Sequence, residues 1–208
     1  MESVFPQDHL SENDAAVSDV VAANTDDSLG ESQWLVWLNI LGLSGAKFLW
    51  QKPKDPRQRT YASNGRIYKV YAHVPDLEDA ARPKRLEHEY AMIRRCAGIA
   101  GVPQALAHER HGPMEITIYR AIDAESLHDR RLTLLPMMAA VFQLAVILAR
   151  HSWRGIAHND LTSSNVLFAR NGRCYLVDFD LSLVTTRTQA FHRNFIRDRV
   201  SRETGFFG

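Results

Sequence analysis

Three oxygen-bearing side chains, Asp160, Asn165 and Asp178, have types and spacings that suit phosphoryl transfer. Asp160 and Asn165 lie five residues apart, and Asp178 follows thirteen residues later. The charge of a transferred phosphoryl group must be neutralised by a divalent cation, and Mg²⁺ accepts carboxylate and amide oxygens as ligands. A further carboxylate must take the proton of the attacking hydroxyl. We therefore predict Asp160 as the catalytic base and Asn165 and Asp178 as metal ligands.

The flanking residues predict how these side chains are positioned. Two apolar runs, 166–168 and 175–177, flank a segment that contains Ala-Arg-Asn-Gly-Arg at 169–173, and Asn-Gly between apolar runs is a strong hairpin signal. A hairpin would return Asp178 to the turn that carries Asp160 and Asn165. The alternative is a solvated loop rich in Asp and Asn, but such a loop does not account for the apolar runs.

The segment HNDLTSSN at 158–165 resembles the catalytic loop H-x-D-L-x-x-x-N of the protein-kinase-like superfamily. Asp178-Phe179-Asp180 resembles the metal-binding D-F-G, with Asp in place of Gly. Asn159 also departs from the usual Arg or Gly, and Asp180 either adds a metal ligand or caps a turn. The resemblance covers about Gly42 to Arg202 and implies ATP and Mg²⁺ as cofactors. Its specific part is His158 to Asp180.

The resemblance implies a phosphate-binding loop and a lysine upstream. In residues 34–51 we expect a strand, a glycine turn and a strand, in which Gly42, Gly45 and Ala46 bring backbone N–H groups to phosphates. An amphipathic helix ending at Gly42 fits the same residues. Residues 51–64 are polar and predict a loop. The alternating run 66–71 predicts a third strand carrying Lys69, the expected phosphate-pairing lysine.

A charged helix is predicted over 76–97, since Leu86, Tyr90 and Ile93 share one face. Kinases place on this helix a glutamate that pairs with the strand lysine. Glu89 is the first candidate for that role and Glu87 the second.

Two further strands are expected, one after Gly101-Val102-Pro103 and one over 114–122. The resemblance places a hinge at Arg120, Ala121 and Ile122, whose backbone would bind adenine.

A nearly apolar segment, 132–149, leads into the catalytic loop, and its length approaches that of a membrane-spanning helix. We interpret it instead as the buried central helix of the larger lobe, beginning near Pro136. After Asp180 the chain has only a short basic tail, with one helix expected over 191–200. The long activation segment and helical subdomain of peptide-directed kinases are therefore not expected.

These expectations define an α+β, two-lobed, protein-kinase-like fold. An antiparallel N-lobe is predicted over 34–122, and a minimal, mainly helical C-lobe over 123–208. Residues 1–33 contain eight acidic residues and no Lys or Arg, and we expect this segment to be disordered. The remainder of the chain is basic, which suits a phosphate-bearing ligand or an anionic surface, although a solvated basic face fits equally.

Cysteine usage and the N-terminus indicate the compartment. Cys96 and Cys174 are far apart without metal-ligand spacing, which favours a reducing environment, and the N-terminus has no secretory pattern. We expect a cytoplasmic protein, with peripheral association at the inner face of the membrane as an option.

The acceptor is not fixed by these residues. The shortened lobe, the D-F-D motif and the arginine-rich tail resemble bacterial lipopolysaccharide kinases, including the Kdo and heptose kinases, which implies a saccharide or glycolipid hydroxyl. The loop also resembles small RIO-type kinases and the kinase/ATPase of a tRNA-modifying complex. A pseudokinase that binds nucleotide without turnover is a third hypothesis. Nucleic acid is the least favoured partner.

Overall fold

The computed structural model describes residues 31–52, 55–73 and 85–196, which fall into two units. The described part of the first unit comprises 31–52, 55–73 and 107–118, and that of the second comprises 85–106 and 119–196. This division places 85–106 with the second unit, whereas the sequence predicted a continuous lobe over 34–122. The predicted acidic segment over 1–33 lies almost wholly outside the described residues.

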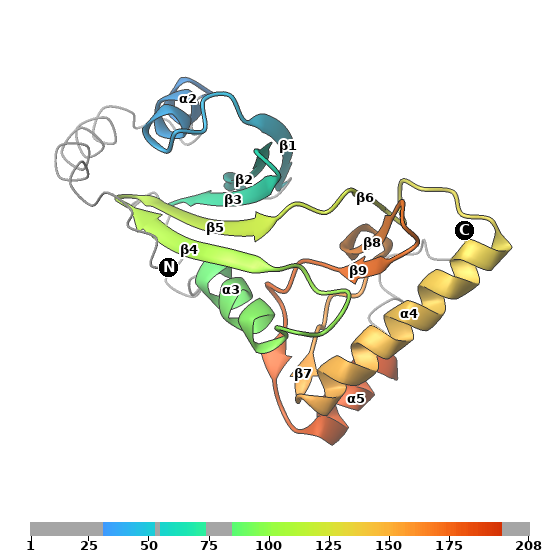
Figure 1. Cartoon of the computed structure of the whole chain (residues 1–208). Helices are drawn as coiled ribbons and strands as arrows, with labels where there is room; N and C mark the ends of the chain where they lie inside the picture. Colours follow the sequence, from blue (N-terminus) through green and yellow to red (C-terminus); the bar gives the residue numbers. More distant parts are fainter. Residues whose placement is uncertain (1–30, 53–54, 74–84, 197–208) are drawn as a thin grey trace, which may run out of the picture. The chain divides into compact units, whose positions relative to one another are not determined.

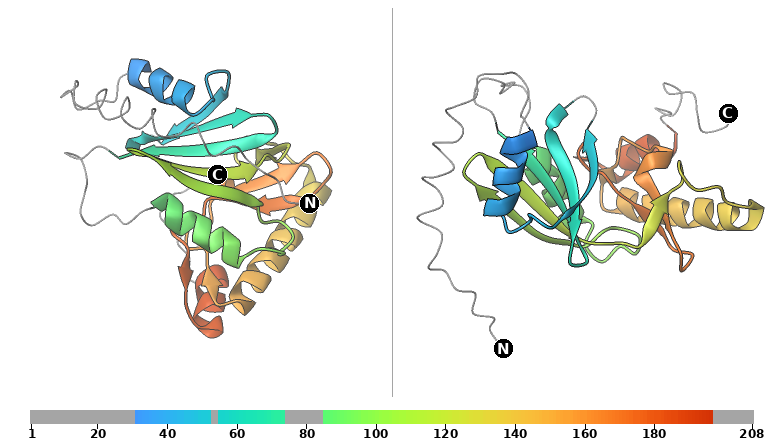
Figure 2. Two further views of the ribbon diagram at one scale, coloured as in Figure 1. Left: turned by 60° about the vertical axis from the view of Figure 1, so that its left-hand side comes forward. Right: turned by 90° about the horizontal axis from the view of Figure 1, so that it is seen from above.

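A five-stranded antiparallel sheet dominates the first unit (Figures 1 and 2). Its order is β1-β2-β3-β5-β4, so the third and fifth strands are neighbours. The two strands predicted after Gly101-Val102-Pro103 and over 114–122 are both present, as is the strand predicted over 66–71. The strands are β1 (Lys47–Lys52), β2 (Asp55–Ser63), β3 (Arg66–Ala72), β4 (Ala105–His111) and β5 (Met114–Arg120).

The prediction of a loop over 51–64 is wrong, because β2 occupies most of it and pairs with both β1 and β3. The prediction failed because several polar side chains of this strand are buried rather than solvated. Arg59 is 8% exposed, stacks over Trp34 at 4.7 Å and pairs with Glu31 at 2.9 Å. These partners allow a cationic side chain to be buried in a strand whose composition is typical of a solvated loop.

The prediction of a strand over the first half of 34–51 is also wrong, because α2 (Glu31–Ile40) is a helix. Its residues Trp34, Trp37 and Leu38 have helical spacing and are buried in a core with Tyr61, Val70, Ala72, Met114 and Ile116. The helix ends where Gly42 adopts φ +65°, a conformation that glycine takes readily. The sequence-based alternative, a helix ending at Gly42, is therefore the one observed.

The second unit combines helices with short strands. Its helix α3 (Arg85–Arg95) confirms the described part of the helix predicted over 76–97, and residues 76–84 of that prediction lie outside the described residues. The predicted hairpin is confirmed, with β8 (Val166–Ala169) paired to β9 (Cys174–Leu176). The remaining elements are β6 (Ala124–Ser126), α4 (Leu134–Trp153), β7 (Ile156–Ala157), η2 (Ser163–Asn165), β10 (Leu183–Val184) and α5 (Arg187–Phe195).

The long helix α4 was expected to be buried, but most of its buried residues lie in its C-terminal half, with Ala140 buried in the N-terminal half and Trp153 exposed at the end. Ile147, Leu148 and His151 are buried near α5 and β7, whereas Leu134, Leu135 and Phe142 are each more than 70% exposed. Among the described residues, α4 is the one helix long and apolar enough to cross a membrane by length and composition, and 22% of its apolar window is buried. The expected burial is therefore corrected for the N-terminal half.

Candidate active site

The loop after β7 brings Asp160 and Asn165 together. Asn159 adopts φ +63°, a left-handed conformation that Asn tolerates better than most residues, and its Nδ2 donates to the Leu181 carbonyl at 3.1 Å. Asn165 ends the short helix η2, and its Nδ2 donates to Asp160 Oδ2 at 2.9 Å and to the Asp160 carbonyl at 3.0 Å. With the amide nitrogen committed to Asp160, the Oδ1 of Asn165 is the atom left to face a cation.

The β8–β9 hairpin returns Asp178 to this loop. The Val177 N–H donates to the Asn165 carbonyl at 2.9 Å, so the end of the hairpin is bonded to the end of η2. Asp178 itself adopts φ +63°, in the left-handed region where Asp is tolerated. Because of this backbone conformation, the side chain of Asp178 points in a different direction from the one it would have if the strand continued.

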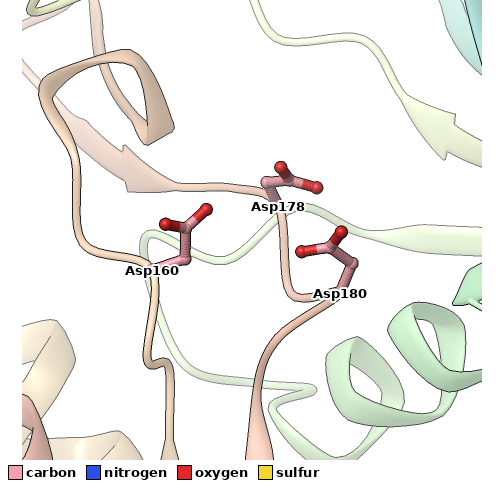
Figure 3. A group of neighbouring side chains, drawn as sticks. All are labelled: Asp160, Asp178 and Asp180. Carbon is pink, nitrogen blue, oxygen red and sulfur yellow. The ribbon is translucent and has the colours of Figure 1, made fainter. Parts of the chain in front are cut away.

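Three carboxylates gather where these segments meet (Figure 3). One oxygen from each of Asp160, Asp178 and Asp180 lies within 4.8 Å of the others, and all three side chains are half-buried. Like charges this close repel one another unless a cation lies between them. Hard carboxylate oxygens with the adjacent Asn165 amide oxygen form the donor set that Mg²⁺ prefers, so these residues fit a magnesium ion.

The sequence left two roles open for Asp180, that of a metal ligand and that of a residue that caps a turn. Its position in the cluster supports the ligand role, because its carboxylate lies with those of Asp160 and Asp178. The turn that follows is closed by backbone, since the Ser182 N–H donates to the Phe179 carbonyl at 3.1 Å.

Phe179, between the two acids, faces the opposite way and is completely buried. Its ring meets His158 edge-on at 4.8 Å and His151 at 5.4 Å. Burial lowers the pKa of His158 to about 4, despite the opposing effects of the Val177 carbonyl and of Asp178 and Asp180. Burial, assisted by the charges of His158 and Arg154, lowers the pKa of His151 to about 3. Both imidazoles are therefore neutral in the folded protein near pH 7 and act as packing groups beneath the acids.

Asn194 on α5 is a positioning residue that the sequence reasoning missed. Its Oδ1 accepts from the His158 N–H at 2.9 Å, and its Nδ2 donates to Ser152 Oγ and to the Ile156 carbonyl, each at 3.0 Å. The side chain thus connects the catalytic loop to the last turn of α4 and to β7. A signal was available: Ala190 and Asn194 are four residues apart on the buried face of α5, where a polar residue requires partners.

Lys69 and Glu89 occupy the elements predicted for them. Lys69 is half-buried on β3, in the first unit, and Glu89 lies on α3, in the second. Glu89 is 1% exposed, whereas Glu87 is exposed, so burial separates the two candidates. A buried carboxylate needs a cation or donors, which favours Glu89 for the paired role. The pairing itself stays a prediction. The same helix is connected to the acidic motif, since His88 Nε2 donates to the Ser182 carbonyl at 2.7 Å.

Gly42, Gly45 and Ala46 lie between α2 and β1 rather than between two strands. The Gly42 N–H donates to the Asn39 carbonyl at 3.0 Å, and the Ala46 N–H donates to the Leu43 carbonyl at 2.9 Å. Two of the three backbone groups predicted to hold phosphate are thus committed to local turns. Their phosphate role stays a prediction without support from this geometry.

A pocket of about 390 Å³ lies beside the predicted hinge and is lined by Arg120, Ala121 and Ile122 together with the turn of the β8–β9 hairpin. The carboxylates lie at the other end of that hairpin, so the pocket is separate from them. The Arg120 N–H donates to the Gln104 carbonyl, and the Ile122 carbonyl accepts from the Ala124 N–H. Adenine binding at the hinge stays a prediction.

Comparisons with known proteins show the family of the chain. Residues 7–189 match the phosphotransferase enzyme family, and the chain therefore belongs to that family. Among solved structures it is similar to WbdD, with 18% identity and a TM-score of 0.55 over 66% of this chain and 33% of WbdD. The chain thus spans about a third of the length of WbdD. The family and this likeness confirm the protein-kinase-like α+β fold, and no curated protein matches the chain.

Proposed function

We propose that this phosphotransferase moves the γ-phosphoryl group of ATP to a hydroxyl of a lipopolysaccharide-type saccharide, with Mg²⁺ as cofactor. The observation that carries the proposal is the cluster of Asp160, Asp178 and Asp180, within 4.8 Å of one another and beside Asn165. Membership in the phosphotransferase family supports the reaction class. The saccharide acceptor rests on the resemblance of the shortened lobe, the D-F-D motif and the basic tail to lipopolysaccharide kinases.

Each residue has a distinct proposed role. Asp160 accepts the proton of the attacking hydroxyl, and the hydrogen bond from Asn165 holds its carboxylate in place. Asp178, Asp180 and the amide oxygen of Asn165 would hold magnesium, which neutralises charge on the phosphates when it is bound. Lys69, oriented by Glu89, would contact the phosphates of the nucleotide.

The proposal is tested by incubating the protein with labelled ATP, Mg²⁺ and a panel of lipopolysaccharide core saccharides and free sugars. We expect transfer to a saccharide that Asp160→Asn abolishes and Glu109→Gln leaves intact, because Glu109 is an exposed acid on β4. Unchanged transfer by Asp160→Asn would rule out the assigned base. Transfer to protein or stimulation by tRNA, without transfer to any saccharide, would favour a RIO-like kinase or ATPase instead.

The role of Asp180 has its own test. Asp180→Asn keeps the shape of the side chain and removes one charge, so we expect the Mg²⁺ concentration for half-maximal activity to rise. An unchanged magnesium dependence would make Asp180 a structural residue.

A nucleotide-binding pseudokinase is the second candidate, because the N–H groups of Gly42 and Ala46 are bonded in local turns and do not orient phosphates for transfer. Stabilisation of the protein against heat by ATP and Mg²⁺, combined with no loss of ATP and no transfer to any acceptor, would support that alternative.

For location, we propose a cytoplasmic protein that associates with the inner face of the membrane. A glycolipid acceptor would require the enzyme to work at that surface.

A further inference from the structure

The second unit carries an extended apolar surface that the active site does not use. On α4, Leu135, Met138, Phe142 and Trp153 follow one another at spacings of three, four and eleven residues, which places them along one face of the helix. Their exposed fractions are 77%, 60%, 71% and 69%. Several large apolar side chains exposed on one face of a helix are uncommon on a soluble monomer and mark an interaction site.

This row continues onto α5. The guanidinium of Arg187, the first residue of α5, lies 4.4 Å from the ring centroid of Trp153. Phe191 and Phe195 follow Arg187 at four and eight residues, are 50% and 42% exposed, and stack on each other at 4.8 Å. We call these two rows together the α4–α5 apolar face: Leu135, Met138, Phe142, Trp153, Phe191 and Phe195.

The surroundings of this face are basic. Neither α4 nor α5 contains an Asp or a Glu. Arg150 is exposed in the last turn of α4, and Arg131 is exposed just before its first turn. Arg187 lies over the ring of Trp153. An apolar face with arginines beside it and an exposed tryptophan is the pattern of a helix that lies in a lipid–water interface.

We propose that the α4–α5 apolar face binds the surface of an anionic membrane. The arginines complement lipid phosphates, and the apolar side chains enter the boundary between head groups and acyl chains. A second copy of the chain is a poorer occupant, because a two-fold contact would bring arginines against arginines with no acidic residue on either helix to pair with them.

The helix α4 lies on the membrane in this arrangement and does not span it. Its last turns are packed against α5, and Ser152 Oγ accepts a hydrogen bond from Asn194. A spanning helix would have to break this packing. Figure 1 shows α5 beside the C-terminal half of α4 while the N-terminal half extends beyond it, as does the right-hand view of Figure 2.

The face is also connected to the catalytic loop, since Asn194 of α5 accepts the His158 N–H. Membrane binding would therefore fix the loop that carries Asp160 relative to an acceptor held in the lipid surface. This consequence rests on the proposed glycolipid acceptor, whereas lipid binding itself does not.

The test is co-sedimentation of the full chain with vesicles of phosphatidylcholine alone or mixed with phosphatidylglycerol. We expect binding to the mixed vesicles that weakens as salt is raised. Met138→Ser combined with Phe142→Ser should lower partitioning of the protein onto the mixed vesicles by about a hundred-fold or more, since two apolar side chains that would enter the lipid are lost. Arg150→Gln should lower it about five-fold on the anionic vesicles.

Leu35→Ser is the matched control, because Leu35 is an apolar residue of α2, outside this face, that is 59% exposed. It should bind like the unmodified protein. Thermal melts check that each variant is folded, and transfer of phosphate to a soluble acceptor reports the chemistry separately from lipid binding.

Two results would overturn the proposal. One is that the unmodified protein stays in the supernatant with anionic vesicles, or that the Met138→Ser, Phe142→Ser double variant binds these vesicles as well as the unmodified protein does. The other is a dimer in sedimentation velocity that the double variant abolishes while vesicle binding is absent, which would assign the face to a second copy.

Discussion

The candidate active site has two layers built from the same short segments: an upper layer of carboxylates and a lower layer of buried rings. In Asp178-Phe179-Asp180 the two acids join Asp160 in a half-buried cluster, while the phenylalanine between them is completely buried against His151 and His158. The upper layer concentrates like charge, which costs stability unless a cation is bound. The lower layer removes charge, since both histidines are held neutral.

This contrast separates function from support. Changing a carboxylate of the upper layer should lower activity or raise the magnesium requirement, while the fold stays as stable as before or becomes more so. Changes in the lower layer should act first on stability, and on activity only through the position of the loop.

The sharpest test of the upper layer is Asp160→Asn. We expect activity to fall by about 10²- to 10⁴-fold, since general-base catalysis contributes on that order. The melting temperature should stay equal or rise, because one of three clustered charges is removed. Steady-state kinetics and calorimetry on the same preparation measure both. A large drop in melting temperature would show that Asp160 is a support residue, and the division into layers would fail.

The largest stability effect in the lower layer is expected for Phe179→Ala. Truncating a completely buried phenylalanine costs about 3–5 kcal/mol of unfolding free energy. Phe179→Leu should cost considerably less, because it fills most of the same volume. Urea unfolding compares the two variants. If they were equally destabilised, the contact with the histidine rings rather than the filled volume would be responsible.

Asn194→Ala should come next, at about 2–3 kcal/mol, because it leaves the His158 N–H and the Ile156 carbonyl without a partner in a buried region. His192→Ala on the same helix is the control, since His192 is exposed. If the side chain also positions the loop, activity measured well below the melting temperature should fall while the affinity for nucleotide is kept. Equal losses for both variants would point to helix propensity instead.

Much of the second unit could be predicted because its signals are local. The Asn-Gly turn and the apolar runs on either side specify the hairpin, and the hairpin brings Asp178 to Asp160. Short-range turn chemistry and alternation need no knowledge of distant partners.

The errors in the first unit have the opposite cause. The strand β2 looked like a loop because Gln58, Arg59 and Thr60 are polar, and the burial of Arg59 is explained by Glu31 and Trp34, which lie more than twenty residues away in the chain. Residues 34–40 fitted both a strand and a helix, and packing of both tryptophans against the sheet decides between them.

The role of Asn194 and the exposure of the N-terminal half of α4 also could not be predicted from local sequence patterns. The first depends on contacts between residues 36 to 42 positions apart in the chain. For α4, the apolar composition predicts that something covers the helix, but it cannot separate a protein core from another apolar partner.

The lower layer should also make stability depend on pH. The pKa values of His151 and His158 in the folded protein are about 3 and about 4, below the value of about 6.5 in an unfolded chain. The unfolded chain therefore binds more protons, and stability falls as the pH drops below about 6.5, by up to about 1.4 kcal/mol per pH unit for each histidine. Urea unfolding between about pH 7 and pH 5 should show this slope, and His151→Phe should reduce it by roughly half because one buried imidazole is removed. A slope that His151→Phe does not alter would mean that the carboxylate cluster, and not the buried histidines, governs the response of the protein to acid.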